Sequence, residues 1–293
     1  MNLRARTGRG LRPLAAPATR RVAGRALVLA SIFAVAATLA AASPARMRAD
    51  AQWRLVFYDN FKQGLNTLWW GAYNGQPGGD PGGWWSPSHV VVNNGVLNLQ
   101  TYRDPRYGRR WVSGGISSGP ALKQTYGKYE IRVRMDAGKG VGIAALLWPA
   151  RNMWPPEIDF AENGGETGIR RTVTATLHWG RVDHQAQRQI RVDFTRWHTL
   201  GVEWLPGQLI YTIDGRQWAV LKSSAVPAQP MELDIQTQAG TCGEWWAPCP
   251  DRHTPQHVNA QIAWVAAYAY QPSASGSQTN RFEAGQRPRA AGL

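Results

Sequence analysis

Between residues 52 and 272, hydrophobic positions alternate with polar ones by twos, and no segment shows a helical period. Tyr129, Ile131 and Val133, for example, alternate with charged residues, as in a strand with one buried face and one solvated face. Gly, Pro, Asn and Asp separate the segments. The pattern predicts strands at 90–92, 96–102, 129–135, 142–148, 172–179, 198–204, 208–213, 216–221, 231–238 and 260–270.

About ten short strands joined by such turns predict an all-β fold, an antiparallel two-sheet sandwich. Residues 113–118 contain two glycines and no nucleophile motif, so we expect a turn there. We expect a single catalytic or binding domain over 52–271. Residues 272–293 are rich in Ser, Gly, Gln and Arg, which predicts a disordered basic tail.

The first 51 residues have the layout of an export segment. Residues 1–25 carry seven Arg and no acid, and 26–42 form an apolar stretch of 17 residues. We expect a signal peptide cleaved near Ala49–Ala51, with an uncleaved membrane anchor as the alternative. Either way the domain faces outward, secreted or periplasmic. Export makes a disulfide between Cys242 and Cys249 the expected state of the two cysteines.

The net charge of +14 belongs mostly to the chain ends. Residues 1–51 hold nine Arg against one Asp, whereas 52–272 hold 21 Lys and Arg against 17 acids. The domain therefore lacks the basic cluster that nucleic-acid binding requires, and we expect no nucleic-acid partner. All 15 Trp lie between Trp53 and Trp264, where indoles serve as core residues or as stacking platforms.

Three acids in six residues stand out, in the segment Glu157-Ile158-Asp159-Phe160-Ala161-Glu162. Strand parity places Glu157 and Asp159 opposite the apolar residues, but Glu162 joins them only if a β-bulge at 160–161 absorbs one residue. The Cα atoms of Glu157 and Glu162 would then lie about 13 Å apart. Side chains that lean together bring their carboxyls to about 5–6 Å, the separation of a nucleophile and an acid/base in a retaining glycosidase.

Asp159 between them would hold one Glu and separate the two pKa values. The structural alternatives for this pattern are an exposed acidic strand face and a calcium ligand cluster. The preceding Trp154-Pro155 and the many indoles favour chemistry on a sugar instead. No His, Cys, Asp or Glu cluster has zinc spacing, and no glycine-rich segment leads from a strand into a helix as a phosphate loop would.

The acidic segment resembles the bulged active-site motif of glycoside hydrolase family 16, which includes laminarinases and lichenases. The resemblance covers roughly 53–270, and the further similar blocks are LVFYDNF at 55–61, YGKYEIR at 126–132, LWP at 147–149, TLHW at 176–179 and HTLGVEW at 198–204. It implies a jelly-roll, concanavalin-like β-sandwich with a concave substrate cleft. It also implies Glu157 as nucleophile, Asp159 as its assistant and Glu162 as acid/base.

The resemblance implies no cofactor in the chemistry. Some members bind a structural calcium on the convex side, but this chain has Asn60 and Ala263 at the corresponding places, which argues against calcium without excluding it. The resemblance and the parity of the strands together suggest residues that contact the sugar. These substrate-binding candidates are Trp148, Trp154, His178, Gln236, Gln238, Trp245 and Trp246.

We therefore expect a monomeric retaining endo-glycoside hydrolase of β-linked polysaccharide, with β-1,3-glucan as the first substrate to test. A membrane partner is expected only if the N-terminal segment stays uncleaved. Lichenan, agar, carrageenan and bacterial exopolysaccharide are alternative substrates. A transglycosylase on the same site and a non-catalytic carbohydrate-binding lectin are alternative functions, and the intact acid pair argues against the lectin.

Overall fold

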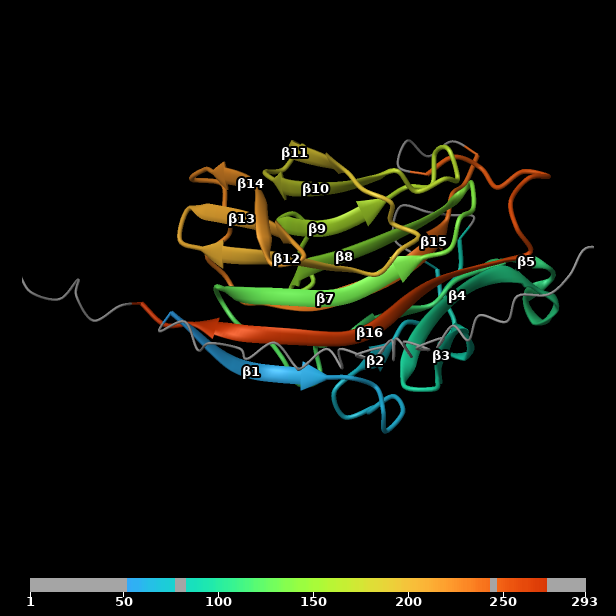
Figure 1. Ribbon diagram of the computed structural model, residues 1–293, viewed down its shortest axis with the longest axis horizontal. Coiled ribbons are helices and arrows are strands. Elements are labelled where there is room, and N and C mark those ends of the chain that lie inside the picture. The colour runs from blue at the N-terminus through green and yellow to red at the C-terminus, as the bar shows by residue number, and fades with distance from the viewer. Residues whose placement is uncertain (1–51, 77–82, 243–246, 273–293) are drawn as a thin grey trace, which may run out of the picture. The chain divides into compact units, whose positions relative to one another are not determined.

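The computed structural model describes residues 52–76, 83–242 and 247–272 (Figure 1). The expected export segment at 1–51, the tail from 273 onward and the Trp245-Trp246 pair lie outside the described residues. No helix within the described ranges has the length and apolarity needed to cross a membrane.

Two antiparallel sheets form the domain, which confirms the predicted sandwich. The first sheet has the order β14-β13-β12-β7-β16-β4-β3, with β1 on β16 and β5 on β4. Its strands are β1 Trp53–Asp59, β3 Val90–Asn93, β4 Val96–Asp104, β5 Arg110–Val112, β7 Gly127–Met135, β12 His198–Leu205, β13 Gln208–Ile213, β14 Arg216–Lys222 and β16 His257–Tyr270.

The second sheet has the order β11-β10-β9-β8-β15-β6-β2. Its strands are β2 Gly71–Ala72, β6 Gly115–Ser117, β8 Val141–Pro149, β9 Glu157–Asn163, β10 Thr172–Trp179, β11 His184–Arg191 and β15 Met231–Ala239. Two short 3₁₀ helices, η1 Pro87–His89 and η2 Pro105–Tyr107, flank the hairpin of β3 and β4.

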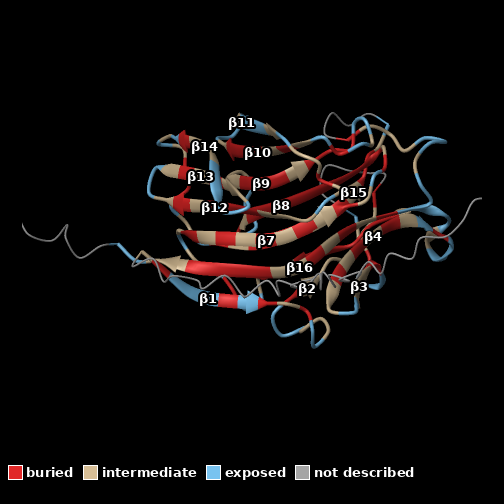
Figure 2. Cartoon of the chain, viewed as in Figure 1, coloured by how far each residue is buried: buried red, intermediate tan, exposed pale blue. Residues whose placement is uncertain are grey.

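The core lies between the sheets, and each strand contributes alternate side chains to it. In β7 every second residue is buried, so that Ile131 packs inward while its neighbours stay half-buried. The central strand β8 is buried along nearly its whole length, whereas the edge strand β11 is mostly exposed (Figure 2). The alternation in the sequence therefore defines the two faces of each sheet correctly.

The prediction of a turn at 113–118 is wrong, because Gly115–Ser117 form β6 and pair with β15 and β2. Glycine is required here because neighbouring segments approach the backbone too closely for a side chain. A Cβ on Gly115 would lie 2.5 Å from the ring of Tyr73, and one on Gly114 would lie 2.5 Å from the carbonyl oxygen of His89. Strand β11 was also missed, because its sequence is almost entirely polar.

The predicted bulge in β9 is confirmed by the pairing on both sides of the strand. Against β8, Ala161 lies opposite Ala145 and Asp159 opposite Leu146, so one residue of β9 is extra. The pairing with β10 shifts at the same point. Phe160 and Ala161 both join the core, and the next residue, Glu162, returns to the face that carries Asp159.

Arg170 secures the far end of β9. Its buried guanidinium donates hydrogen bonds to the side chain of Asn163 at 2.7 Å and to the carbonyl oxygens of Asp136 at 3.0 Å and Gly138 at 2.8 Å. Burial lowers the pKa of Arg170 to about 10, so the side chain stays charged at neutral pH. The hydrogen bonds replace the water that the buried charge has lost.

We expect Arg170→Met to lower the free energy of unfolding by about 3 kcal/mol or more, because three acceptors around a buried site lose their charged donor. Urea unfolding at neutral pH measures this. The matched control is Arg171→Met, since Arg171 is exposed and its carboxylate partner Asp193 lies 3.7 Å away. That variant should change stability by less than about 0.5 kcal/mol, and equal losses in the two variants would contradict the role of Arg170.

Candidate active site

The bulged strand β9 presents Glu157, Asp159 and Glu162 on the face of the second sheet that points away from the core. On the neighbouring strand they lie opposite His178, Thr176 and Thr174, respectively. His178 and Thr174 are four residues apart, which corresponds to about 13 Å along the strand. The structure therefore brings the three predicted acids into one row, as expected.

The two outer acids each accept a short hydrogen bond. Trp154 Nε1 donates to Glu157 Oε2 at 2.6 Å, and Thr176 Oγ1 donates to Glu162 Oε2 at 2.6 Å. Glu157, Asp159 and His178 offer polar side-chain atoms that lie within 4.8 Å of one another. Each of the two outer acids is thus held by a donor from a residue with few rotatable bonds, which orders it before any ligand arrives.

His178 lies in this row, as strand parity predicts, and it is 8% exposed. Its Nε2 atom is 3.2 Å from Asp159 Oδ2, and its Nδ1 atom is 2.8 Å from Asp183 Oδ1. Gln185 donates to the other oxygen of Asp183 at 2.6 Å. The imidazole therefore connects the buried middle acid to a surface carboxylate.

Burial raises the pKa of Glu157 well above its ordinary value, and the carboxylate of Asp159 adds to the rise. Burial also raises the pKa of Asp159, which is 1% exposed, and the charge of Glu162 contributes in the same direction. Three ionised carboxylates in a row repel each other where little water screens them. Glu157 and Asp159 therefore keep their protons to higher pH than isolated carboxyls do.

The other predicted sugar contacts divide into three groups. Trp154 is 45% exposed beside Glu157, while Trp148 is half-buried and its indole donates to Asn152 Oδ1 at 2.8 Å. Gln236 lies opposite Ala144, which itself lies opposite Glu162, so this glutamine shares the acidic face. Gln238 follows on the same face, opposite Gly142. Trp245 and Trp246 fall outside the described residues.

Sequence reasoning missed Asp234, which lies in the same row as Asp159 with Leu146 between them. Asp234 is 5% exposed, and Tyr73 Oη donates to its Oδ2 atom at 2.5 Å. Its Oδ1 atom is buried without a hydrogen-bond partner among the described residues. The clue was the parity of 231–238, because the alternation that aligns Gln236 and Gln238 also includes Asp234.

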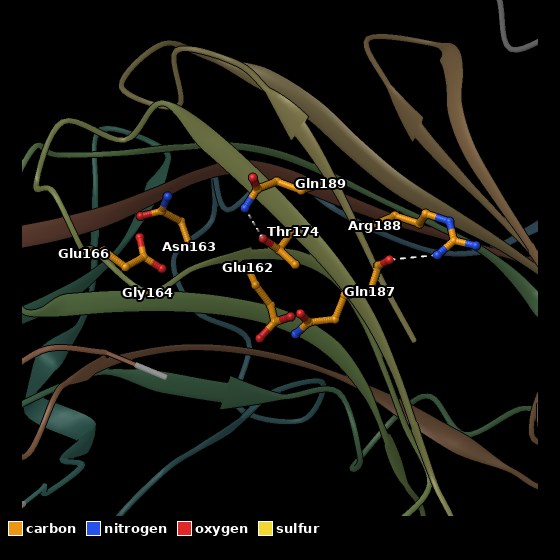
Figure 3. Close-up of a pocket in the computed structure, with 8 residues that line it drawn as sticks. All are labelled: Glu162, Asn163, Gly164, Glu166, Thr174, Gln187, Arg188 and Gln189. Carbon is orange, nitrogen blue, oxygen red and sulfur yellow. Dashed lines mark hydrogen bonds between the residues drawn. The ribbon is translucent and has the colours of Figure 1, made fainter. Parts of the chain in front are cut away.

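A hollow of about 430 Å³ lies beside Glu162, between β9 and the edge strand β11 (Figure 3). Gln187 and Gln189 of β11 line it, and they donate to Thr176 at 3.4 Å and to Thr174 at 3.3 Å. The wall beside the acids is thus made of oriented amides and hydroxyls, which suit the hydroxyl groups of a sugar.

Glu157, Asp159 and His178 are the one group in the described ranges with three ligand atoms close enough for a metal ion, all within 4.8 Å of one another. Trp154 occupies one oxygen of Glu157. His178 Nε2 likewise contacts Asp159 Oδ2, at 3.2 Å.

The places considered for calcium lie in the first sheet. Asn60 follows β1, and its Oδ1 atom accepts from the backbone N–H of Lys62 at 3.2 Å. Ala263 lies in β16, where the pairing with β7 shifts by one residue. The expectation about calcium stays untested by this geometry.

Cys242 and Cys249 are joined by a disulfide with a Cα–Cα distance of 4.7 Å, which confirms the predicted pairing. The bridge closes a short loop directly after β15, the strand that carries Gln236 and Asp234. It therefore limits the motion of the chain where it leaves the acidic face.

An antiparallel sandwich with carboxyls, amides and indoles on one open sheet face has the features of a carbohydrate-active protein. The sequence profile described as Glycosyl hydrolases family 16 matches residues 82–266. The chain belongs to this family.

Individual relatives agree with this assignment. An endo-1,3-1,4-beta-glycanase ExsH of Rhizobium meliloti (strain 1021) is 29% identical over 158 residues, which cover 51% of this chain and 34% of that protein. A beta-glucanase of Rhodothermus marinus is 30% identical over 136 residues, which cover 42% of this chain and 47% of that protein. The chain spans about a third to a half of the length of the curated relatives it matches.

Solved structures share the fold. The endo-beta-1,3-glucanase from Pyrococcus furiosus superposes with a TM-score of 0.67 at 22% identity, covering 76% of this chain and 97% of that chain. The laminarinase from Rhodothermus marinus superposes with a TM-score of 0.66 at 24% identity, covering 75% of this chain and 98% of that chain.

Asp234 gives a prediction for stability against pH. Burial raises its pKa in the folded protein to about 7, above the unfolded value near 3.8, so the folded state binds this proton more tightly. The stabilisation is complete below about pH 4 and is lost as the pH rises towards 7, at about 1.4 kcal/mol per unit of pKa difference.

Asp234→Asn removes this loss, so the stability of the variant relative to wild type should rise between pH 4.5 and pH 7.5. Urea unfolding of both proteins at the two pH values measures the difference. A relative stability that is constant with pH would show that Asp234 is not a buried, proton-holding group.

Proposed function

We propose that this chain is an exported, retaining endo-glycoside hydrolase that cleaves β-glucan by double displacement. The observation that carries the proposal is the bulge of β9, which sets Glu157 and Glu162 on one face with the buried Asp159 between them. The curated relatives named as glycanases and glucanases support the substrate class. The disulfide is consistent with export.

In this mechanism Glu157 is the nucleophile. Its carboxylate attacks the anomeric carbon while the bond to the leaving sugar oxygen breaks, and Glu162 gives its proton to that oxygen. Water then attacks the glycosyl ester, Glu162 takes a proton from the water, and Glu157 departs as the carboxylate. The anomeric configuration is thus inverted twice and retained overall.

Asp159 allows Glu157 to be ionised while Glu162 is protonated, as the first step requires. When Glu157 is ionised, a proton held by the buried Asp159 keeps the middle acid neutral, while Trp154 donates a hydrogen bond to Glu157. A protonated Asp159 also removes one negative charge from the row, which lowers the free energy needed to ionise Glu157. Asp159 is therefore a positioning and charge-balancing residue.

We propose β-1,3-glucan as the first substrate, with mixed-linkage glucan as the next, because the relatives are named for both linkages. A xyloglucan endotransglucosylase/hydrolase of Arabidopsis thaliana also matches, at 25% identity over 169 residues. Transglycosylation uses the same acids and differs only in whether a sugar hydroxyl or water accepts the glycosyl group. Product analysis at high oligosaccharide concentration separates these two outcomes.

Glu157→Gln should lower laminarin hydrolysis by more than about a thousandfold, because no glycosyl ester can form. Glu162→Gln should lower it by about 10²–10⁴-fold, and much less on an aryl β-glucoside whose leaving group needs no proton. Reducing-end release measures both losses.

The matched control is Glu130→Gln, an acid of strand β7 in the first sheet that pairs with Lys128 at 3.0 Å, and it should keep wild-type activity. Proton NMR of the first product should show the β anomer. Early appearance of the α anomer would exclude double displacement. Unchanged turnover of the Glu157→Gln variant would exclude Glu157 as the nucleophile.

Trp154→Phe should shift the acidic limb of the pH profile of kcat/KM to higher pH. The indole N–H stabilises the ionised form of Glu157 and lowers its pKa, so loss of the N–H raises that pKa while the ring is kept. The control is Trp148→Phe, whose N–H bonds Asn152 rather than an acid. A limb that moves equally in both variants would contradict the assignment.

A further inference from the structure

A second hollow, of about 660 Å³, lies at the end of the sandwich formed by β4, β5 and the segment before β16. Figure 1 shows β4 and β5 at this end, whereas β9 lies in the middle of the second sheet. None of its lining residues belongs to the acidic row. Its volume is within the range of about 300–1,000 Å³ that is usual for small-ligand sites.

Three arginines from separate segments line this hollow. Arg103 comes from β4, Arg109 from the turn before β5 and Arg252 from the segment before β16. None of the three forms an ion pair with a carboxylate of the described residues. The one acid that lines the hollow, Asp251, is paired with Lys139 at 2.7 Å. The hollow therefore has three positive charges that no acid balances.

Arg103 is held in place without a carboxylate. Its Nη1 atom donates to the carbonyl oxygen of Arg109 at 3.2 Å, and its guanidinium lies over the ring of Trp111, 5.3 Å from the centroid. Arg103 and Trp111 are also directly paired across β4 and β5. The contacts fix the plane of the guanidinium and leave most of its N–H donors available to a ligand.

We propose that this hollow is a binding site for a carboxylate-bearing sugar of an acidic polysaccharide, separate from the catalytic cleft. Arginine presents paired N–H donors that match a carboxylate in a two-point contact. The site is a hollow bounded by three short segments, whereas nucleic-acid binding uses a long basic track that follows the phosphate backbone. Uronates and carboxyl-bearing substituents of sugars share the chemistry that the three arginines recognise.

The test measures binding of a fluorescent hexauronate to the full chain by anisotropy at about 0.15 M NaCl, where the Debye length is about 8 Å and remote charges are screened. Wild type should bind, and the triple variant Arg103→Ala, Arg109→Ala, Arg252→Ala should weaken binding at least about tenfold. The carboxyl-reduced, neutral form of the same oligosaccharide should not bind the wild-type hollow.

The matched control removes three exposed arginines elsewhere, Arg54, Arg196 and Arg216, and should keep the Kd within about threefold. An equal loss in this control would show general charge attraction and overturn the site. Tighter binding of a single-stranded hexadeoxynucleotide through the same three arginines would also overturn it.

The hollow variant should cleave laminarin as wild type does, because it leaves the acidic row intact. Glu157→Gln should conversely bind the hexauronate as wild type does. The two variants therefore separate a failure of this site from a failure of the proposed catalysis. If the hollow variant lost laminarin cleavage but still bound the hexauronate, the proposal would be contradicted.

Discussion

One extra residue in β9 is the constraint on which the acidic row depends. In a regular strand Glu162 would point into the core. Loss of hydration of its unpaired carboxyl would then destabilise the fold by roughly several kcal/mol. The bulge sends Phe160 and Ala161 inward together and restores Glu162 to the open face. Because β9 is paired on both sides, the strands β8 and β10 hold this irregular geometry in place.

The same packing that orders the acids also makes their charges costly. Asp159 and Asp234 are almost fully buried, and the pKa of each is raised because little water reaches them. Tyr73 donates a hydrogen bond to Asp234, and Trp154 and Thr176 donate to the neighbouring Glu157 and Glu162, which compensates in part for the lost water. The face is thus strongly acidic in composition but holds fewer negative charges than its composition suggests.

The alternation of side chains was enough to predict most strands, the sandwich and the faces on which Glu157 and His178 lie. The bulge was predictable because three acids in one strand need a common solvated face. Gly115 misled the prediction, since a glycine required by the nearby Tyr73 ring looks the same in sequence as one required by a turn. Strand β11 forms a hairpin with the preceding β10, but its almost entirely polar sequence hides it, and the Tyr73–Asp234 pair joins distant segments, which local patterns do not encode.

Strand β11 is both a wall of the hollow beside Glu162 and the open edge of its sheet. Its glutamines and arginines keep that edge soluble, because an apolar edge strand would pair with other chains and aggregate. Substitutions that make this wall more hydrophobic in order to alter sugar preference would therefore also create an aggregation-prone edge strand. Specificity and solubility are coupled in this one strand, and its substitutions are best chosen among polar residues.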